Sequence, residues 1–275
     1  MGLRINSNIE ALNAYRNLTN TAIGLSKSME KLSSGLRINR AADDAAGLAI
    51  SEKLNSQVRG LFQAQRNAQD GISLIQTAEG ALTETQSILQ RMRELSVQAA
   101  NDTLTADDRN AIKSELDSLL AEVDRIANNT EFNTKTLLNG SFGATSLTFQ
   151  VGANKNQAIA ITIGTATTAA LTINAISVGD VTAANASISL LDDALKAIST
   201  SRASLGAVQN RLEHTIANLG VASENLQAAN SRIRDVDMAQ EMMTFSKFQI
   251  LQQAGTAMLA QANMMPQAVL QLIGR

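Results

Sequence analysis

Residues 191–233, "LDDALKAISTSRASLGAVQNRLEHTIANLGVASENLQAANSRI", decide the fold of this chain. Apolar residues return at alternating steps of four and three for six heptads, which is the pattern of a coiled-coil helix. Its stripe is Leu191, Leu195, Ile198, Arg202, Leu205, Gln209, Leu212, Ile216, Leu219, Ser223, Leu226, Asn230 and Ile233. We expect the polar members of the stripe to set register and partner choice, at some cost in stability.

The N-terminal half of the chain carries stripes that such a helix could pack against. A first one is formed by Leu18, Ala22, Leu25, Met29, Leu32 and Leu36. The stretch "SSGLRINRAADD" (33–44) interrupts it with a helix-stopping glycine. A second stripe continues to about Ala99 and is formed by Leu54, Val58, Leu61, Gln65, Ala68, Ile72, Ile75, Glu79, Leu82, Gln86 and Leu89. A third helix follows a capping box formed by Thr105 and Asp108. The sequence therefore predicts three helices before the middle of the chain.

The middle of the chain has a different pattern. Residues 146–164 alternate apolar and polar side chains around a turn, which predicts a β-hairpin. Residues 165–185 are rich in Ala and Thr and indicate loop or weak strand. The predicted fold is mainly α, with long antiparallel coiled-coil helices from both chain ends and a small β-hairpin region between them. We expect one domain from residues 1–42 with 234–275, and a second from residues 43–233 with a reduced central part at 140–184.

The C-terminal stretch 248–274 contains no charged residue, although apolar residues recur three or four apart along one helix face. Repeated glutamines argue against a membrane span, and a helix lying on a membrane surface would usually carry basic residues on its polar face. We therefore favour packing against other protein helices over binding to a membrane. The predicted assembly interface is Leu18, Leu25, Met29, Leu32, Leu36, Leu251, Met258, Met265, Val269 and Leu272.

The composition excludes several classes of function. The chain has no cysteine and one histidine, His214, without a second candidate ligand beside it, so no metal site and no cofactor are predicted. Phosphate-loop, dinucleotide-binding and nucleophile-elbow motifs are missing, which argues against an enzyme. The net charge of −2 gives no general attraction to nucleic acid. No ordinary secretory signal is recognisable at the N-terminus.

Several motifs, in order along the chain, resemble those of bacterial flagellin over essentially the whole length. They are "RINSNIEALNAYRNL", "LSSGLRINRAADDAAGLAIS", "RNAQDGISLIQTAEGAL", "QRMRELSVQAAN", "EFNTKTLLNG" and "FQILQQAGTAMLAQAN". The resemblance implies a structural subunit of the helical flagellar filament, which drives swimming motility. It also implies export, unfolded, through the flagellar type III channel to the outside of the cell. The middle is shorter than in the best-known members, which implies a thinner and smoother filament.

The same resemblance implies the partners of the chain. Besides other copies of itself, these are an export chaperone that binds the C-terminal helix, the filament cap protein and hook–filament junction proteins. Two host receptors also recognise members of the family. By motif, Arg91, Leu95, Gln98 and Glu115 stand where contacts to Toll-like receptor 5 stand, with Leu95 as the apolar anchor. Val269, Leu270, Leu272 and Ile273 stand where a cytosolic NAIP-type receptor binds.

Two other readings remain open at this point. A hook–filament junction protein shares flagellin-like ends but would act as an adaptor in few copies. A coiled-coil binding module would form a stable, defined oligomer instead of a polymer. We expect the terminal segments to be disordered in the monomer and to fold when they stack with other copies, since a two-helix pair has too little core to be stable alone.

Overall fold

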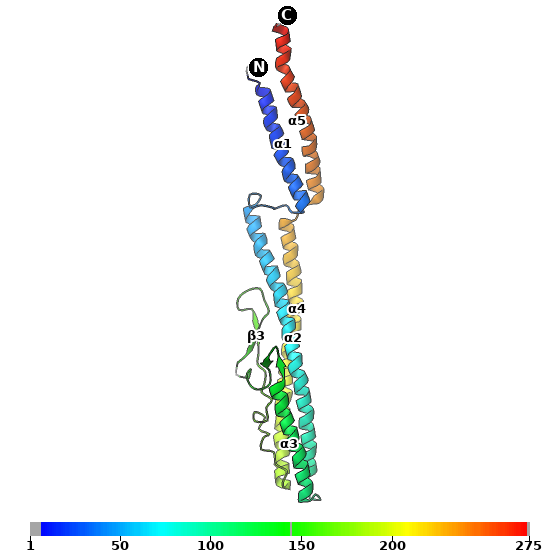
Figure 1. Ribbon diagram of the computed structural model, residues 1–275. Coiled ribbons are helices and arrows are strands. Elements are labelled where there is room, and N and C mark those ends of the chain that lie inside the picture. Colours follow the sequence, from blue (N-terminus) through cyan, green and yellow to red (C-terminus); the bar gives the residue numbers. More distant parts are fainter. Residues whose placement is uncertain (1–6, 144, 274–275) are drawn as a thin grey trace. The chain divides into compact units, whose positions relative to one another are not determined.

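The computed structural model describes residues 7–143 and 145–273, with side chains described as far as residue 265. The described chain contains five helices and two small antiparallel sheets (Figure 1). The helices are α1 (Ile9–Ser34), α2 (Ala45–Ala99), α3 (Ala106–Asn129), α4 (Val181–Arg234) and α5 (Met238–Ile273). The strands are β1 (Glu131–Phe132), β2 (Lys135–Thr136), β3 (Leu147–Gln150) and β4 (Ala158–Ile161). The predicted mainly α fold with a small central β region is confirmed.

The chain divides into two compact units. One contains residues 1–56 and 225–275, and the other contains residues 57–224. Helices α2 and α4 each contribute to both units. The domain boundaries expected from the sequence lie 14 residues before the first boundary of this division (42 against 56) and 9 residues after the second (234 against 225), and they stay a prediction.

The unit of residues 57–224 holds one continuous apolar core. Helix α2 buries Ile75, Ala78, Leu82, Leu89 and Met92 completely. Positions 75, 82 and 89 belong to the predicted stripe, whereas 78 and 92 lie beside it. The buried face is wider than a two-helix contact needs, because α3 packs against the same helix with Ile112, Leu116 and Val123 among its buried residues (Figure 1).

Helix α4 supplies the third side of this core. Its buried apolar positions include Leu191, Ala194, Ile198, Leu205 and Leu212. The stripe is interrupted where Arg202 stands: its guanidinium donates to Gln86 Oε1 at 2.6 Å and to Glu79 Oε1 at 3.5 Å, both on α2. This polar contact joins α4 to α2 at a stripe position where the sequence predicts a register-setting residue, and that role stays a prediction.

The predicted hairpin is present as β3 and β4, which pair antiparallel with Leu147 opposite Ile161. It lies against α2 at two glycines: Gly60 meets Ala153, and Gly71 meets the ring of Phe149. The segment that follows has no regular structure, yet it buries Ile163, Ala166, Leu171, Ile173, Ile176 and Val178. This irregular segment is held to α3, because Asp124 accepts hydrogen bonds from both the backbone N–H and the hydroxyl of Thr168.

The β1–β2 pair has no counterpart among the elements predicted from the sequence. Its turn residues Asn133 and Thr134 both adopt positive φ, at 49° and 63°. Asparagine tolerates this conformation, but a β-branched threonine rarely adopts it. Within the described residues, no helix is both long and apolar enough to cross a membrane.

Candidate assembly surface

The terminal helices α1 and α5 pack side by side in one unit (Figure 1). Their contacts recur every seven residues along α5 and run backwards along α1, so the pair is antiparallel. These contacts include Glu241 with Lys31, Phe248 with Gly24, Gly255 with Leu18, and Ala262 with Asn8. A seven-residue repeat of contacts is the geometry of a two-stranded coiled coil.

Two glycines allow the terminal helices to approach closely. A Cβ at Gly24 would lie 2.7 Å from Cζ of Phe248, so the aromatic ring occupies the space of the missing side chain. A Cβ at Gly255 would lie 3.1 Å from Cδ1 of Leu18. The glycines thus act as holes for single large side chains.

The pair is held at one end by a backbone clasp between the two linkers. Gly35 ends α1 with a φ of 71°, and its carbonyl accepts from the N–H of Val236 at 3.0 Å. Arg37 N–H donates to the carbonyl of Arg234 at 2.7 Å, and the Arg37 guanidinium donates to the carbonyl of Ile233. This clasp places the start of α5 beside the end of α1.

Despite this packing, the terminal pair buries little. Ser28 is the buried residue of α1, and no described side chain of α5 is buried. Many large apolar side chains instead face water, with Met243, Ile250 and Met258 more than three-fifths exposed. We call the exposed set the terminal apolar surface: Ile9, Leu12, Tyr15, Ile23, Met29, Met238, Met242, Met243, Ile250, Leu251, Met258, Met264 and Met265.

The predicted interface residues separate into two groups in the structure. Leu18, Leu25, Leu32 and Leu36 are half-buried, Leu36 in the clasp opposite Asp235. Met29, Leu251, Met258 and Met265 are exposed and belong to the terminal apolar surface. Val269, Leu270, Leu272 and Ile273 have side chains outside the described residues.

Sequence reasoning therefore missed part of this surface. Leu12, Tyr15 and Ile250 lie off the predicted stripes. A prediction that gives each helix one apolar face leaves these three residues exposed to solvent. For Ile250, the signal that could have found it is the charge pattern, since the last charged residue of the described part of α5 is Lys247. A helix that packs on one side only would normally carry charged residues on its water-facing sides.

A groove of about 370 Å³ lies between α1 and α5. It is lined by Ala14, Asn17, Leu18, Thr21, Leu251, Ala254, Gly255 and Met258. None of these residues is charged, so an apolar side chain from another molecule would enter it without leaving an ion unpaired. The groove and the terminal apolar surface share Leu251 and Met258, and together form the candidate site.

A second, charged feature lies on the surface of the unit of residues 57–224. Arg91 donates from Nε and Nη2 to Oε1 of Glu115 and from Nη1 to Glu94. The hydrogen bond to Glu115 raises the pKa of Arg91 above its ordinary value. Gln98 is also exposed on this helix.

Leu95 does not join this surface. Its side chain is only 2% exposed and belongs to the apolar core, because its helix face is covered by neighbouring core side chains. The expectation that Leu95 is an apolar anchor for the receptor stays a prediction, and the burial of its side chain argues against it. The exposed apolar residue of this turn is Val97.

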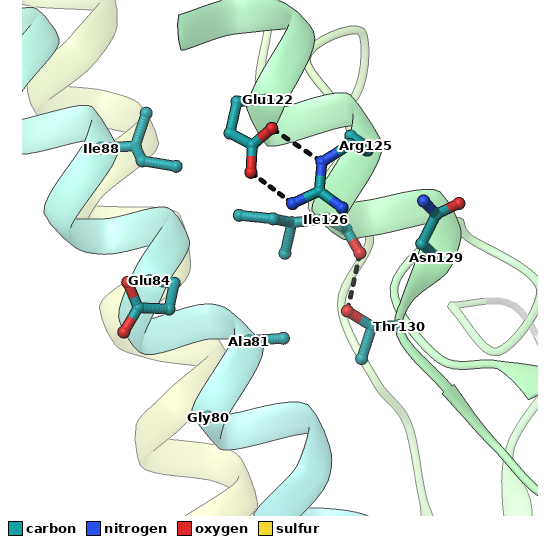
Figure 2. Close-up of a pocket in the computed structure, with 9 residues that line it drawn as sticks. All are labelled: Gly80, Ala81, Glu84, Ile88, Glu122, Arg125, Ile126, Asn129 and Thr130. Atoms are coloured by element: carbon teal, nitrogen blue, oxygen red, sulfur yellow. Dashed lines mark hydrogen bonds and ion pairs between the residues drawn. The ribbon is translucent and has the colours of Figure 1, made fainter.

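The groove between α2 and α3 offers no catalytic arrangement among the residues that line it (Figure 2). It has a volume of about 470 Å³ and an apolar wall formed by Ala81, Ile88 and Ile126. The carboxylate of Glu122 is neutralised by two hydrogen bonds from Arg125, which lower the pKa of Glu122. Across the described chain, no group of three or more potential metal ligands comes together.

Comparison with known proteins identifies both ends of the chain. The family model of the bacterial flagellin N-terminal helical region matches residues 5–143. The family model of the bacterial flagellin C-terminal helical region matches residues 188–273. The two matches cover most of the chain and flank the β3–β4 hairpin.

Whole-length relatives agree with this result. A flagellin from Halalkalibacterium halodurans is 56% identical, over 98% of this chain and 99% of its own. A flagellar filament 33 kDa core protein from Treponema phagedenis is 53% identical over the same shares. The crystal structure of Bacillus cereus flagellin is 34% identical and matches 56% of this chain and 88% of its own, with a TM-score of 0.49. The chain belongs to the bacterial flagellin family, whose members are structural filament proteins and not enzymes.

Proposed function

We propose that this flagellin polymerises into the helical flagellar filament through the terminal apolar surface and the groove beside it, and so serves swimming motility. The observation that carries the proposal is the exposure of large apolar side chains on α1 and α5, on helices that bury almost nothing within one chain. Apolar area of this kind is stabilising only when another surface covers it.

The occupant of the surface is other copies of this chain. The face of α5 beyond Lys247 has no charge to select a different partner, and its glutamines provide amide donors and acceptors for a tight contact between copies. Full-length similarity to flagellins and to a filament core protein supports a polymer subunit over an adaptor present in few copies.

The terminal helices gain their full stability only on assembly. A pair with one buried side chain on α1 leaves most of its apolar area in water, and isolated helices are marginal. Ordering these segments during polymerisation couples folding to binding.

The finer roles also follow from family resemblance. The subunit leaves the cell through the flagellar type III channel with the help of an export chaperone, and adds beneath the cap protein of a filament that starts at the hook–filament junction proteins. Arg91, Gln98 and Glu115 support contact with Toll-like receptor 5 because they are exposed together on one surface. Residues 269–273 support contact with a NAIP-type receptor by motif alone.

Seeded reassembly tests the polymer proposal. Dissociated full-length chain is mixed with short filament seeds and followed by light scattering and electron microscopy. A chain lacking residues 1–40 and 235–275 serves as the comparison, with its circular dichroism melt checked, because the buried core lies outside the removed segments. Long filaments from the full chain alone would support the proposal. A stable small oligomer that ignores seeds would refute it and favour a binding module.

A further inference from the structure

The methionines of this chain are concentrated on the proposed assembly surface. Of nine methionines, six are on α5, and all six are exposed. The most exposed are Met243 at 68%, Met258 at 65% and Met264 at 60%. Met92, on α2, is fully buried in the core.

These thioethers are the most readily oxidised side chains of the described surface. The chain has no cysteine and no tryptophan, so two-electron oxidants meet no thiol or indole first. Methionine is converted to its sulfoxide by peroxides, and the reaction is reversible by reductases. The thioether sulfur donates an electron pair to one peroxide oxygen, the O–O bond breaks, and the second oxygen leaves as water. The sulfur is thereby oxidised by two electrons and the peroxide is reduced.

The most exposed methionines differ in how they lie relative to α1. Residues of α5 that meet α1 include Glu241, Phe248, Gly255 and Ala262, spaced by seven. At 100° per residue, Met243 and Met264 lie about 200° from Glu241 and Ala262, on the far side of the helix, whereas Met258 lines the groove between α1 and α5. Oxidation of Met243 and Met264 leaves the α1 contact in place, and oxidation of all three residues changes the surface that another copy must cover.

We infer that the α5 methionines form an oxidation site through which peroxide-class oxidants block polymerisation of the free subunit. The inference rests on the proposed function, because the sulfoxides act by becoming buried between copies. A sulfoxide is polar, and burying it without hydrogen-bond partners is unfavourable. Filaments already formed cover these side chains and protect them.

The test treats full-length monomer with hydrogen peroxide, removes the peroxide with catalase, and measures seeded elongation together with the oxidation of each methionine by peptide mass spectrometry. Met243, Met258 and Met264 are expected to oxidise while Met92 does not, and elongation is expected to fall about tenfold or more. Treatment with both methionine sulfoxide reductases is expected to restore it. The same dose given to finished filaments is expected to oxidise these residues about tenfold more slowly than in monomer.

A triple variant, Met243→Leu, Met258→Leu and Met264→Leu, links the loss to these residues. Its elongation after peroxide is divided by its own untreated elongation, and this ratio is expected to exceed that of the natural chain. Oxidised monomer that extends seeds at the untreated rate, or filaments whose methionines react as fast as those of monomer, would overturn the inference alone. Untreated chain that never extends seeds would overturn the proposed function and the inference with it.

Discussion

Truncation of one side chain on the terminal apolar surface gives the sharpest test of how the filament is stabilised. Ile250 follows Phe248 by two residues, and Phe248 packs against α1 at Gly24. Two residues correspond to about 200° around a helix, so Ile250 points away from α1. Its side chain is 65% exposed in the single chain. Contacts with α1 therefore do not explain an isoleucine at this position.

The size of the effect follows from the area still in water. Full burial of an isoleucine contributes about 1.5–3 kcal/mol. Because roughly two-thirds of the side chain remains exposed, about 1–2 kcal/mol is left for another copy to supply. Ile250→Ala removes most of that area, so the critical concentration for polymerisation is expected to rise about 5- to 30-fold.

The assay is sedimentation of filaments grown from seeds, with the unpolymerised concentration measured at steady state. The melting temperature of the monomer is expected to change little, since exposed substitutions usually alter stability by less than about 0.5 kcal/mol. The matched control is Val221→Ala, on α4, whose side chain is 60% exposed and lies outside the terminal apolar surface. A critical concentration unchanged by Ile250→Ala, or raised equally by Val221→Ala, would refute the reasoning.

Two further predictions concern the unit of residues 57–224. Gly60→Ala places a Cβ 2.9 Å from Cβ and 3.2 Å from Cα of Ala153, so we expect faster amide hydrogen exchange in β3 and β4. Gly80→Ala on the same helix meets open space and is expected to stabilise the folded chain by up to about 1 kcal/mol. The second concerns Asp108, whose pKa is lowered by the hydrogen bond from the Thr105 hydroxyl. A lowered pKa contributes stability that is present above the unfolded-state pKa, about 3.9, and is lost as the pH falls through the folded value. Asp108→Asn is therefore expected to lower the melting temperature at pH 7 and to flatten its decline on acidification below about pH 4. Equal exchange in the two glycine variants, or an unchanged acid profile, would contradict these arguments.

The long helices could be predicted from the sequence because their signals are local and repeated. The capping box at Thr105 and Asp108 is present as expected, and α2 ends at Ala99. Heptad spacing cannot show how many neighbours a helix has. Ala78 and Met92 lie outside the predicted stripe, and they are buried because α3 covers a second face of α2.

The irregular segment between β4 and α4 shows a different limit. Its core residues share no single period, since Leu171 and Ile173 are two apart, as are Ile176 and Val178, but Ile173 and Ile176 are three apart. Their burial depends on distant partners, such as the carboxylate of Asp124 that holds Thr168. A pattern read from neighbouring residues contains no information about such a contact. Leu95 is a similar case, since motif matching gave its position but not its burial.

The unequal burial of the two units has a consequence for the control of assembly. In the unit of residues 57–224, Leu82, Leu89, Leu191 and Ile198 complete their packing within one chain, so the stability of this core is independent of concentration. In the proposed filament, the missing contacts on α1 and α5 come from other copies, and their contribution grows with the concentration of those copies by mass action. A single subunit thus completes its core alone and leaves its terminal apolar surface exposed. Burial of the terminal apolar surface is favourable, and in the proposed filament a subunit gains this free energy only when it joins a growing filament end.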